Sequence, residues 1–310
     1  MSTSAVSAAA DARVTVPLRE DARVIGLVGL AHASSHFAHL LLPPLFPVFA
    51  TEFGLSFSQL GLLMTVFFVI SGVGQAMSGF LVDRVGARPV LFGSLLCFIV
   101  ASLSGYFAQG WGGLLLVAVF AGLGNAPFHP VDFSILNHRV SGPRLGYAFS
   151  AHGLSGNLGW ALTPVFLLFF TELSSWRTGY LAAALLYVGV LAVLVLQREH
   201  LHTEAVVHHA HGDAQGGGAG FLRLPVVWWC FAFFLLSTLT LAVVQNFASP
   251  IMKAMHGVSF EAATTMITAY MLCGALGMLV GGFVAARMPA ASDHVVAWAM
   301  GVGALLIVVA

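Results

Sequence analysis

The sequence carries very little charge for its length. Only 8% of its 310 residues are charged, 12 basic and 12 acidic, whereas 59% are hydrophobic. A water-facing surface needs roughly 25–35% charged side chains, so these charges cannot cover a soluble body of this size. The shortage excludes a soluble globular protein and, with a mean hydropathy of +0.93, predicts a chain that is solvated by lipid.

Other shortages exclude further classes. The formal net charge is zero, so no basic surplus exists to displace counterions from phosphate, which excludes nucleic acid as a partner. The three cysteines, Cys97, Cys230 and Cys273, lie singly in apolar runs, so we expect small core residues and no disulfide framework. The sequence has no GxxxxGKS/T loop, and its apolar stretches hold no Ser/His/Asp or HExxH arrangement. We therefore expect neither ATP hydrolysis nor another enzymatic activity, and no cofactor.

What the sequence does have is a series of apolar stretches of about 18–25 residues, the length an α-helix needs to cross the hydrocarbon core of a bilayer. They lie near residues 24–49, 59–82, 89–108, 112–136, 145–170, 177–197, 224–250 and 262–286. A ninth begins near residue 294 and is still running at Ala310, with no polar flank. We expect an all-α membrane protein, and the chain looks like a fragment.

Basic residues predict the orientation, because cytoplasmic loops retain Lys and Arg. With the N-terminus inside, ten basic residues fall on the inner side and two, Arg177 and Lys253, on the outer side. The inner ten are Arg13, Arg19, Arg23, Arg84, Arg88, Arg139, Arg144, Arg198, Arg223 and Arg287. None is left within a span, so polar chemistry inside the membrane must come from His, Asp, Asn, Gln and hydroxyl groups.

An internal repeat predicts the domain organisation. The segment 79–84 (GFLVDR) after the second span recurs as 282–287 (GFVAAR) after the eighth, 203 positions later. Two six-helix halves in parallel repeat explain this echo, and a complete repeat predicts roughly 400 residues and twelve spans, of which about nine are present. We expect a cytosolic tail (1–23), a six-helix half (24–197), a flexible His/Gly-rich linker (198–223) and a partial second half (224–310).

The turn between the second and third spans carries a specific motif. Residues 79–91 (GFLVDRVGARPVL) resemble the loop motif of the major facilitator superfamily of secondary transporters. A glycine there lets helices approach closely, and the aspartate can pair with a nearby arginine and meet the positive end of a helix. The resemblance implies a latch that joins the two halves at the cytosolic side in the outward-open state. Its residues are Gly79, Asp83, Arg84, Gly86 and Arg88; the second copy has lost the acid, at Ala286.

Glycines and prolines mark candidate hinges. The fifth span resembles the glycine-rich motif of antiporters in that superfamily, and tight helix packing is an equally good explanation of its glycines. Prolines in the first span (Pro43, Pro44, Pro47) and in the fourth remove backbone donors and break the helical ladder. The candidate hinge residues are Pro127, Pro130, Gly153, Gly156, Gly159 and Pro164.

The residues 175–180 (SWRTGY), which open the sixth span, also look like a turn of the superfamily. We favour the simpler interpretation of Trp176 as an interfacial aromatic anchor beside a basic residue.

A closer resemblance links the first, fourth and fifth spans to the fosmidomycin-resistance branch of the superfamily. It rests on His32 followed by the segment 43–47 (PPLFP), on 128–130 (FHP) and on 156–159 (GNLG). The resemblance implies drug export by proton antiport. The sequence departs from that branch where His36 replaces an acid, where Val131 follows the His-Pro pair with Asp132 one place later, and where His152 replaces an apolar or aromatic residue.

Helix geometry brings the histidines together. His32, His36 and His39 follow one another at i, i+4 and i+7, which places them within roughly a 60° arc of one helix face. Counting 1.5 Å per residue from the inner ends of their spans puts His32, His129 and His152 at one depth, roughly 10–12 Å into the membrane. Imidazoles that titrate near neutrality can carry protons or hold an anionic solute. The alternative is that each ring bonds a backbone carbonyl inside the bundle.

Other polar groups within the spans are candidates too. Asn125, Asn157, Gln75, Gln245 and Asn246 can bind solute, although hydrogen bonding between helices is the more frequent use. Asp132 lies near the inner interface, where a carboxylate can simply be solvated. The complete set of expected solute- and proton-binding residues is His32, His36, His39, Asn125, His129, Asp132, His152 and Asn157.

We therefore expect a major-facilitator-type helical bundle that acts as a monomer in the inner membrane, with its N-terminus in the cytoplasm. Its partners are the lipid bilayer, protons and a small organic solute or drug, moved by alternating access as proton-coupled efflux. No resident metal ion is expected. Two alternatives stay open: a transporter-like receptor that binds without flux, and a transition-metal exporter. The exporter would use the histidine cluster and the linker histidines His200, His202, His208, His209 and His211.

Overall fold

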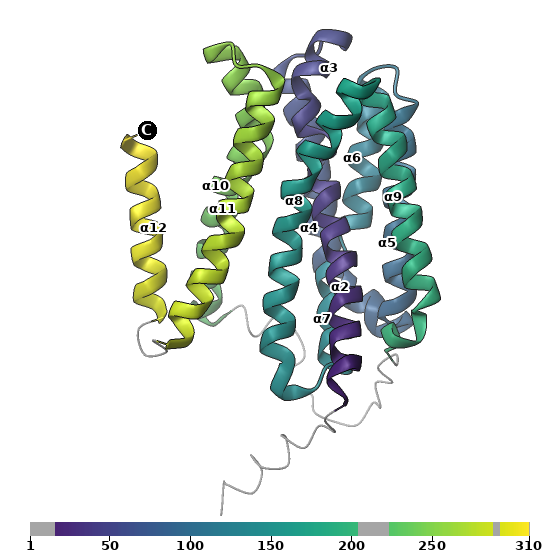
Figure 1. Ribbon diagram of the computed structural model, residues 1–310, viewed down its shortest axis with the longest axis vertical. Coiled ribbons are helices and arrows are strands. Elements are labelled where there is room, and N and C mark those ends of the chain that lie inside the picture. Colours follow the sequence, from purple (N-terminus) through teal and green to yellow (C-terminus); the bar gives the residue numbers. More distant parts are fainter. Residues whose placement is uncertain (1–15, 204–222, 288–291, 310) are drawn as a thin grey trace, which may run out of the picture.

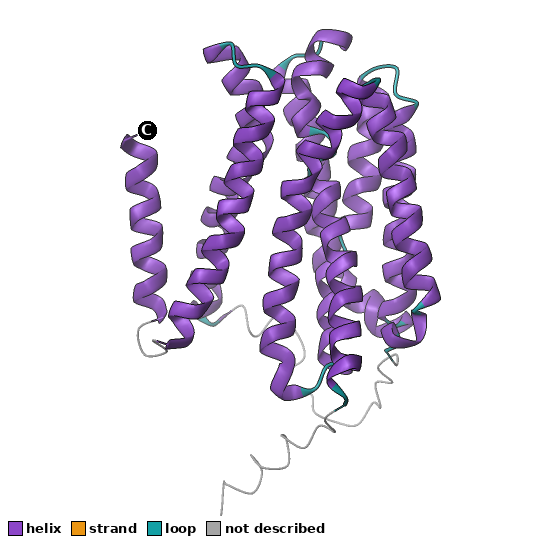
Figure 2. Cartoon of the chain, viewed as in Figure 1, coloured by secondary structure: helices purple, strands orange, loops and turns teal. Residues whose placement is uncertain are grey.

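The computed structural model describes residues 16–203, 223–287 and 292–309, and within these ranges every regular element is a helix (Figure 2). Eight candidate spans are long and apolar enough to cross a membrane, at the eight positions that the sequence predicts. The ninth stretch forms a further apolar helix, α12 (Ser292–Val309). The prediction of an all-α membrane protein is confirmed.

The first apolar span comprises α2 (Leu18–His39), a short turn η1 (Pro43–Leu45) and α3 (Phe46–Phe53). The chain continues through α4 (Phe57–Val85), α5 (Ala87–Tyr106), α6 (Trp111–Asn125), α7 (Phe128–Arg139), η2 (Gly142–Arg144), α8 (Leu145–Leu173), α9 (Trp176–Leu196) and η3 (Arg198–Leu201). Beyond residue 222 follow α10 (Pro225–His256), α11 (Phe260–Arg287) and α12 (Figure 1). We call the end of the bundle that carries residues 16 and 203 the inner end, after the predicted orientation.

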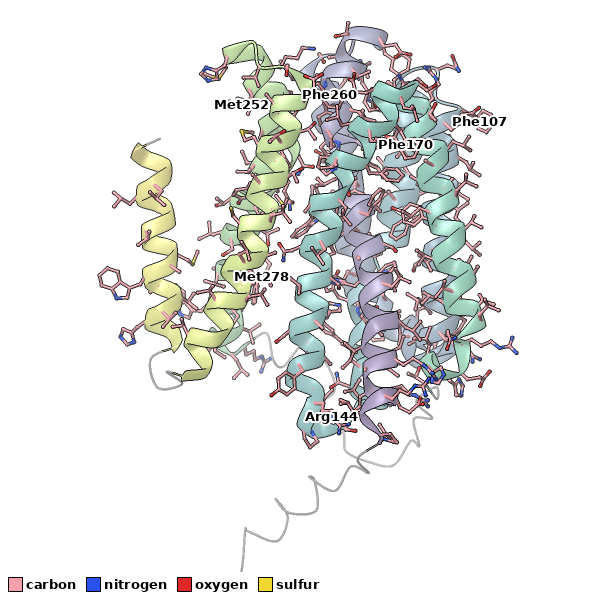
Figure 3. The ribbon with its side chains drawn as sticks, in the orientation of Figure 1. Phe107, Arg144, Phe170, Met252, Phe260 and Met278 are labelled. Atoms are coloured by element: carbon pink, nitrogen blue, oxygen red, sulfur yellow. The ribbon has the colours of Figure 1, made fainter. Side chains whose placement is uncertain are left out.

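Helix α2 begins at Leu18, six residues before the predicted start of the first span. Pro17 stands at its N-cap, and Glu20 and Asp21 lie in its first turn, where acidic side chains favour the positive end of the helix dipole. Asp21 is buried and accepts from Arg144, with 2.6 Å between Oδ2 and Nη1, at the inner end of the bundle (Figure 3). The polar residues 18–23 therefore belong to the helix rather than to a separate tail.

Prolines interrupt two spans, as the sequence predicts. In the first span α2 ends at His39, and the chain passes through the turn η1 before α3 begins at Phe46. In the fourth span α6 ends at Asn125 and α7 begins at Phe128, on either side of Pro127. Pro164, in contrast, stays within the continuous helix α8. A hinge role for these positions stays a prediction.

Packing of the first six spans creates one extensive apolar core, whereas the second half is covered on one side only. Within the first half, α2 packs on α8, α5 lies between α6 and α9, and α4 packs on α6. The second half meets it where α11 packs along α8 and where α10 reaches η1 and α3. The buried residues of α10 all lie in its outer part (Gln245, Asn246, Ser249 and Pro250). The exposed Cys230 and Cys273 contradict the expected core positions, because the described part of the second half leaves their faces uncovered.

The outer end of the first half is held by a polar clamp that the sequence analysis missed. Trp176 donates from Nε1 to Glu52 Oε2 at 2.6 Å, and Arg177 donates from Nη1 to Glu52 Oε1 at 2.8 Å. Arg177 also donates to the carbonyl oxygen of Ala108 and lies 4.1 Å above the Trp176 ring. Because Trp176 is only 3% exposed, its interpretation as an interfacial anchor is wrong: it joins the first span to the sixth.

Removal of this clamp should weaken the first half. We expect Glu52→Ala to lower the free energy of unfolding by about 1 kcal/mol, since two donors, Trp176 Nε1 and Arg177 Nη1, lose a charged acceptor in a partly exposed place. The measurement is the unfolding of the detergent-solubilised protein as a function of temperature. Glu172→Ala removes an exposed acid from the same end and serves as the control. Equal stability of the two variants would contradict the clamp.

Candidate functional site

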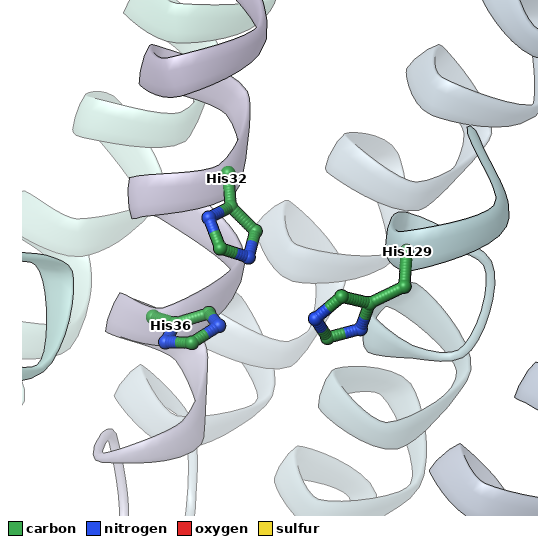
Figure 4. Close-up of side chains that lie close together, drawn as sticks. All are labelled: His32, His36 and His129. Carbon is green, nitrogen blue, oxygen red and sulfur yellow. The ribbon is translucent and has the colours of Figure 1, made fainter. Parts of the chain in front are cut away.

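Five histidines gather in one cluster between three helices. His32, His36 and His39 come from α2, His129 from α7 and His152 from α8. The rings of His32 and His152 stack with their centroids 3.4 Å apart, and His129 lies 5.5 Å from His32. His36 is 4.3 Å from His32 and 5.1 Å from His39. The structure thus brings together the residues that helix geometry placed at one depth; Figure 4 shows three of them.

The part of the cluster nearer the inner end is a connected hydrogen-bond system. His32 Nδ1 lies 2.8 Å from the carbonyl oxygen of His152, which can only accept, so His32 donates from Nδ1. His152 Nε2 lies 3.0 Å from Asp132 Oδ2. Asp132 is fully buried, so its interpretation as a solvated carboxylate is wrong. The interruption before α7 sets its direction, because α7 restarts at Phe128 and turns Asp132 inward toward α8.

In the part of the cluster nearer the outer end, Asn125, the last residue of α6, bonds several neighbours. Its Oδ1 accepts from His39 Nε2 at 2.8 Å and from Ser35 Oγ at 2.7 Å, and its Nδ2 donates to Ser71 Oγ at 2.5 Å. Asn125 therefore joins α2, α4 and α6, which is the helix-to-helix bonding that the sequence analysis left open as the frequent use of such residues.

Four further side chains belong to the site, and only one of them stood among the sequence candidates. Gln75 on α4 places Oε1 at 3.1 Å from His129 Nδ1. Trp160 packs 4.1 Å from the His36 ring, and Ser155 contacts His32 Nδ1 at 3.4 Å, while Ser71 bonds Asn125. Helical periodicity was the available signal for Trp160, because it lies eight residues, or two turns, after His152 on α8.

The glycines of α8 face two different neighbours. A Cβ atom at Gly156 would lie 2.7 Å from His36 Cε1 and 2.8 Å from His32 Cε1, and one at Gly159 would clash with the carbonyl group of Ala33. Gly153 instead lies against Met278 of α11, whose sulfur accepts from Asn157 Nδ2 at 2.7 Å (Figure 3). Close packing therefore accounts for these three glycines, while a hinge role for them stays a prediction. Asn157 lies at the contact between the halves rather than in the histidine cluster.

The loop motif shows a contact that the sequence did not predict. Among the described residues Asp83 makes no ion pair, and a Cβ at Gly79 would meet nothing within 4 Å. Arg88 donates instead to the carbonyl oxygen of Arg198 at 3.3 Å. The expected pairing of Asp83 with a nearby arginine is therefore absent from the described residues in this conformation.

Thr203, near the start of the linker, contacts the loop for which the latch was predicted. Its hydroxyl accepts from the backbone N–H of Ala87 at 3.0 Å, so it caps the first turn of α5. Gly86 has a φ of +82°, and a Cβ there would lie 3.2 Å from the carbonyl oxygen of Thr203. The absence of a side chain at Gly86 therefore lets the first residues of the linker pack against the loop in this conformation.

Two linker histidines lie within the described residues. His200 contacts Glu20 at 3.2 Å and Arg23 at 3.1 Å at the inner end of α2, and His202 is exposed. His208, His209 and His211 lie outside the described residues. His200 is thus held by charged neighbours, away from the histidine cluster.

Two sets of side chains in the cluster have ligand atoms close enough to hold a metal ion. One set is His32, His36 and His129; the other is His32, Asp132 and His152; within each, the ligand atoms lie within 4.8 Å of one another. In the second set Asp132 and His152 already bond each other. The cluster can therefore transfer protons between neighbouring rings, present positive charge, or coordinate a cation.

Comparisons with known proteins agree with this architecture. The Salmonella typhimurium membrane sensor protein UhpC is 27% identical over 249 residues, covering 73% of this chain and 55% of that protein. The Escherichia coli fosmidomycin resistance protein is 30% identical over 183 residues, covering 57% of this chain and 44% of that protein. The chain spans about half the length of the curated relatives it matches.

Solved structures show the same fold. A bacterial homologue of the human lysosomal transporter Spinster, in an inward-facing and occupied conformation, superposes with a TM-score of 0.65 at 19% identity, covering 88% of this chain and 63% of that chain. The model of the Major Facilitator Superfamily matches residues 28–310, which include the whole histidine cluster and all the spans except the first turns of α2. The chain therefore belongs to the Major Facilitator Superfamily.

Proposed function

We propose that the chain belongs to a secondary active transporter that exports a small organic solute across the inner membrane in exchange for protons. The observation that carries the proposal is the cluster of five imidazoles and Asp132, in which His39 and His129 are half-buried and the other members are buried. It lies in spans whose Lys and Arg residues are confined to the inner ends, and ionisable groups deep within a span are costly and mark transport pathways.

The position of the cluster supports a solute site between the halves. Trp160 touches His36 on one side and on the other packs against the apolar contact of Ala161 with Ile267 and Met271 of α11. A movement of α11 against α8 would therefore displace Trp160, and Trp160 would in turn displace the His36 ring. Alternating access needs such a connection between the solute site and the contact that moves.

The order of the polar groups supports proton coupling. From the inner end outward the series runs Asp132, His152, His32, His36 and His39, and each group lies next to the following one. Imidazole is the side chain whose ordinary pKa lies near neutrality, so protons can pass between neighbouring rings. Positive charges on adjacent rings repel, so one or two protons would load the site and an anionic solute would fit it best.

Direction and orientation rest on two further observations. The fosmidomycin resistance protein is 30% identical over 57% of this chain, and its name indicates protection against a drug, which favours efflux. The arginine bias of ten inner to two outer basic residues favours a cytoplasmic N-terminus. We propose that the complete protein works as a monomer.

The test is proton movement during solute flux. The full-length protein that contains this chain is reconstituted into sealed vesicles with a pH-sensitive dye inside, and anionic and neutral compounds are screened. We expect at least one organic anion to drive proton movement in the opposite direction, and an imposed pH gradient to drive its accumulation. Solute flux that neither moves protons nor responds to the gradient would contradict the coupling.

A sensor is the second candidate, because a membrane sensor protein is 27% identical over 73% of the chain. A sensor would bind its ligand at the same histidines without net flux. The same vesicles distinguish the two: saturable binding with no accumulation under any gradient favours the sensor.

The loop motif leads to a separate prediction about conformation. We expect Asp83→Asn to shift the protein toward the state in which the inner ends lie apart, because the carboxylate can no longer help join them in the opposite state. The measurement is the alkylation rate of a cysteine placed by Met278→Cys, with Cys97, Cys230 and Cys273 replaced by serine.

The control is Glu199→Gln, which removes an exposed acid from the same end of the bundle. Alkylation in Asp83→Asn should be faster than in this control. Equal rates in the two proteins would remove the latch.

A further inference from the structure

We propose that His32, His36 and His129 form a binding site for a divalent transition-metal ion such as Zn²⁺ or Co²⁺. One ring nitrogen from each lies within 4.8 Å of the others, and the three rings face one another between α2 and α7 (Figure 4). The inference concerns binding alone and holds whether or not transport is coupled to protons.

Two of the three rings already have their second nitrogen engaged in the way that metal ligands require. His32 donates from Nδ1 to the carbonyl oxygen of His152, so in the neutral ring Nε2 carries the lone pair, and this buried Nε2 has no partner among the described residues. His129 Nδ1 faces Gln75 Oε1, which in that amide orientation leaves Nε2 of His129 as the free acceptor. Metal-binding histidines have such an outer partner, which fixes the ring and its tautomer.

His36 provides the independent observation. It is only 8% exposed, and neither Nδ1 nor Nε2 has a hydrogen-bond partner among the described residues. A buried polar ring with two unsatisfied nitrogens is unfavourable. A metal ion held between His36, His32 and His129 would satisfy one of those nitrogens.

The donor set decides the class of metal. Three neutral imidazoles without a carboxylate suit zinc, cobalt, nickel or copper rather than Mg²⁺ or Ca²⁺, which take oxygen ligands. Three protein ligands leave one position for water or a solute group, as in exchangeable rather than structural zinc sites. Tetrahedral nitrogen ligands lie about 3.3 Å apart, so the rings must close slightly around the ion.

The alternative set of His32, Asp132 and His152 is less suitable. Asp132 Oδ2 and His152 Nε2 bond each other, so a metal would first have to break that contact. The two sets share His32 but differ in their other members. Variants of the other members therefore identify which set binds.

The test measures Co²⁺ and Zn²⁺ binding to the purified full-length protein in detergent, with a histidine-free affinity tag. Alanine replaces all five linker histidines (His200, His202, His208, His209 and His211), so that the linker cannot contribute. We expect one ion per chain by calorimetry, visible Co²⁺ absorption bands of a four-coordinate site, and affinity that falls as pH falls, because protons compete for the nitrogens.

Single variants locate the ligands. His36→Ala and His129→Ala should each weaken binding by at least about a hundredfold, whereas His138→Ala, an exposed histidine on the same helix as His129, should leave it unchanged. Each variant must elute as a folded species in size-exclusion chromatography. If an alanine variant does not, His36→Gln or His129→Gln is used in its place.

The proposal is overturned if the protein that lacks the five linker histidines binds no ion. It is also overturned if His36 and His129 variants bind normally while Asp132→Asn and His152→Ala do not. Because no gradient or vesicle is involved, failure here leaves the transport proposal untouched, and loss of flux in vesicles leaves this one untouched.

Discussion

Replacement of His32 or His129 by alanine is expected to abolish proton-coupled solute flux while the protein still inserts into the membrane. His32 is the centre of the cluster: its ring stacks on His152, contacts His36 and lies 5.5 Å from His129. Its removal leaves only the more distant His129 ring, 5.9 Å from His152 and 6.3 Å from His36, between the inner pair and the outer rings, so the closely spaced series is interrupted. Alanine at position 129 removes the imidazole through which α7 contacts the rings of His32, His36 and His152.

The measurement is solute-driven proton movement in vesicles, which should fall to the level of protein-free vesicles in both variants. Membrane insertion is followed by the amount of protein recovered in the membrane fraction. His138→Ala provides the matched control, since it removes an exposed imidazole nine residues along the same helix. Full activity in both cluster variants would count against the cluster as the coupling site.

The largest stability effect is expected at Gly159. A Cβ there would clash with the backbone carbonyl of Ala33, and backbone atoms inside a helix cannot move aside as a flexible side chain can. We expect Gly159→Val to destabilise the protein by about 3 kcal/mol or more, a large share of a typical total stability of about 5–15 kcal/mol. Because α2 carries three of the histidines, its separation from α8 should also disperse the cluster.

Thermal unfolding in detergent measures this effect. The matched control is Gly146→Val on the same helix, where a Cβ would meet nothing within 4 Å; it should change stability by well under about 1 kcal/mol, because valine is no poorer a helix former than glycine. Similar midpoints for the two variants would falsify the packing argument.

Several features of the site were predictable from the sequence because they depend on one helix at a time. The i, i+4, i+7 spacing fixed His32, His36 and His39 on one face of α2, since helix geometry is set by the backbone alone. Rise per residue placed His129 and His152 at the depth of His32. The prolines of the first and fourth spans indicated the interruptions at η1 and before α7.

Other features depended on how helices rotate and pack against one another. Asp132 was expected near solvent, but α8 covers it with His152. Trp176 was expected at the lipid interface, but the first span brings Glu52 beside it. Asp83 was expected in an ion pair, but the linker's Thr203 holds the loop instead. No spacing within one segment contains this information.

The sequence by itself thus determined the solvent, the spans and which residues share a helix face, because an apolar chain in lipid must satisfy its backbone hydrogen bonds within each helix. Only the tertiary structure decided which faces meet. That choice depends on small residues such as Gly156 and Gly159, which permit α8 to approach α2 closely enough for four of the imidazoles to come together with that of His152. Contacts between helices arise from shape complementarity over the whole bundle, which no single stretch of sequence encodes.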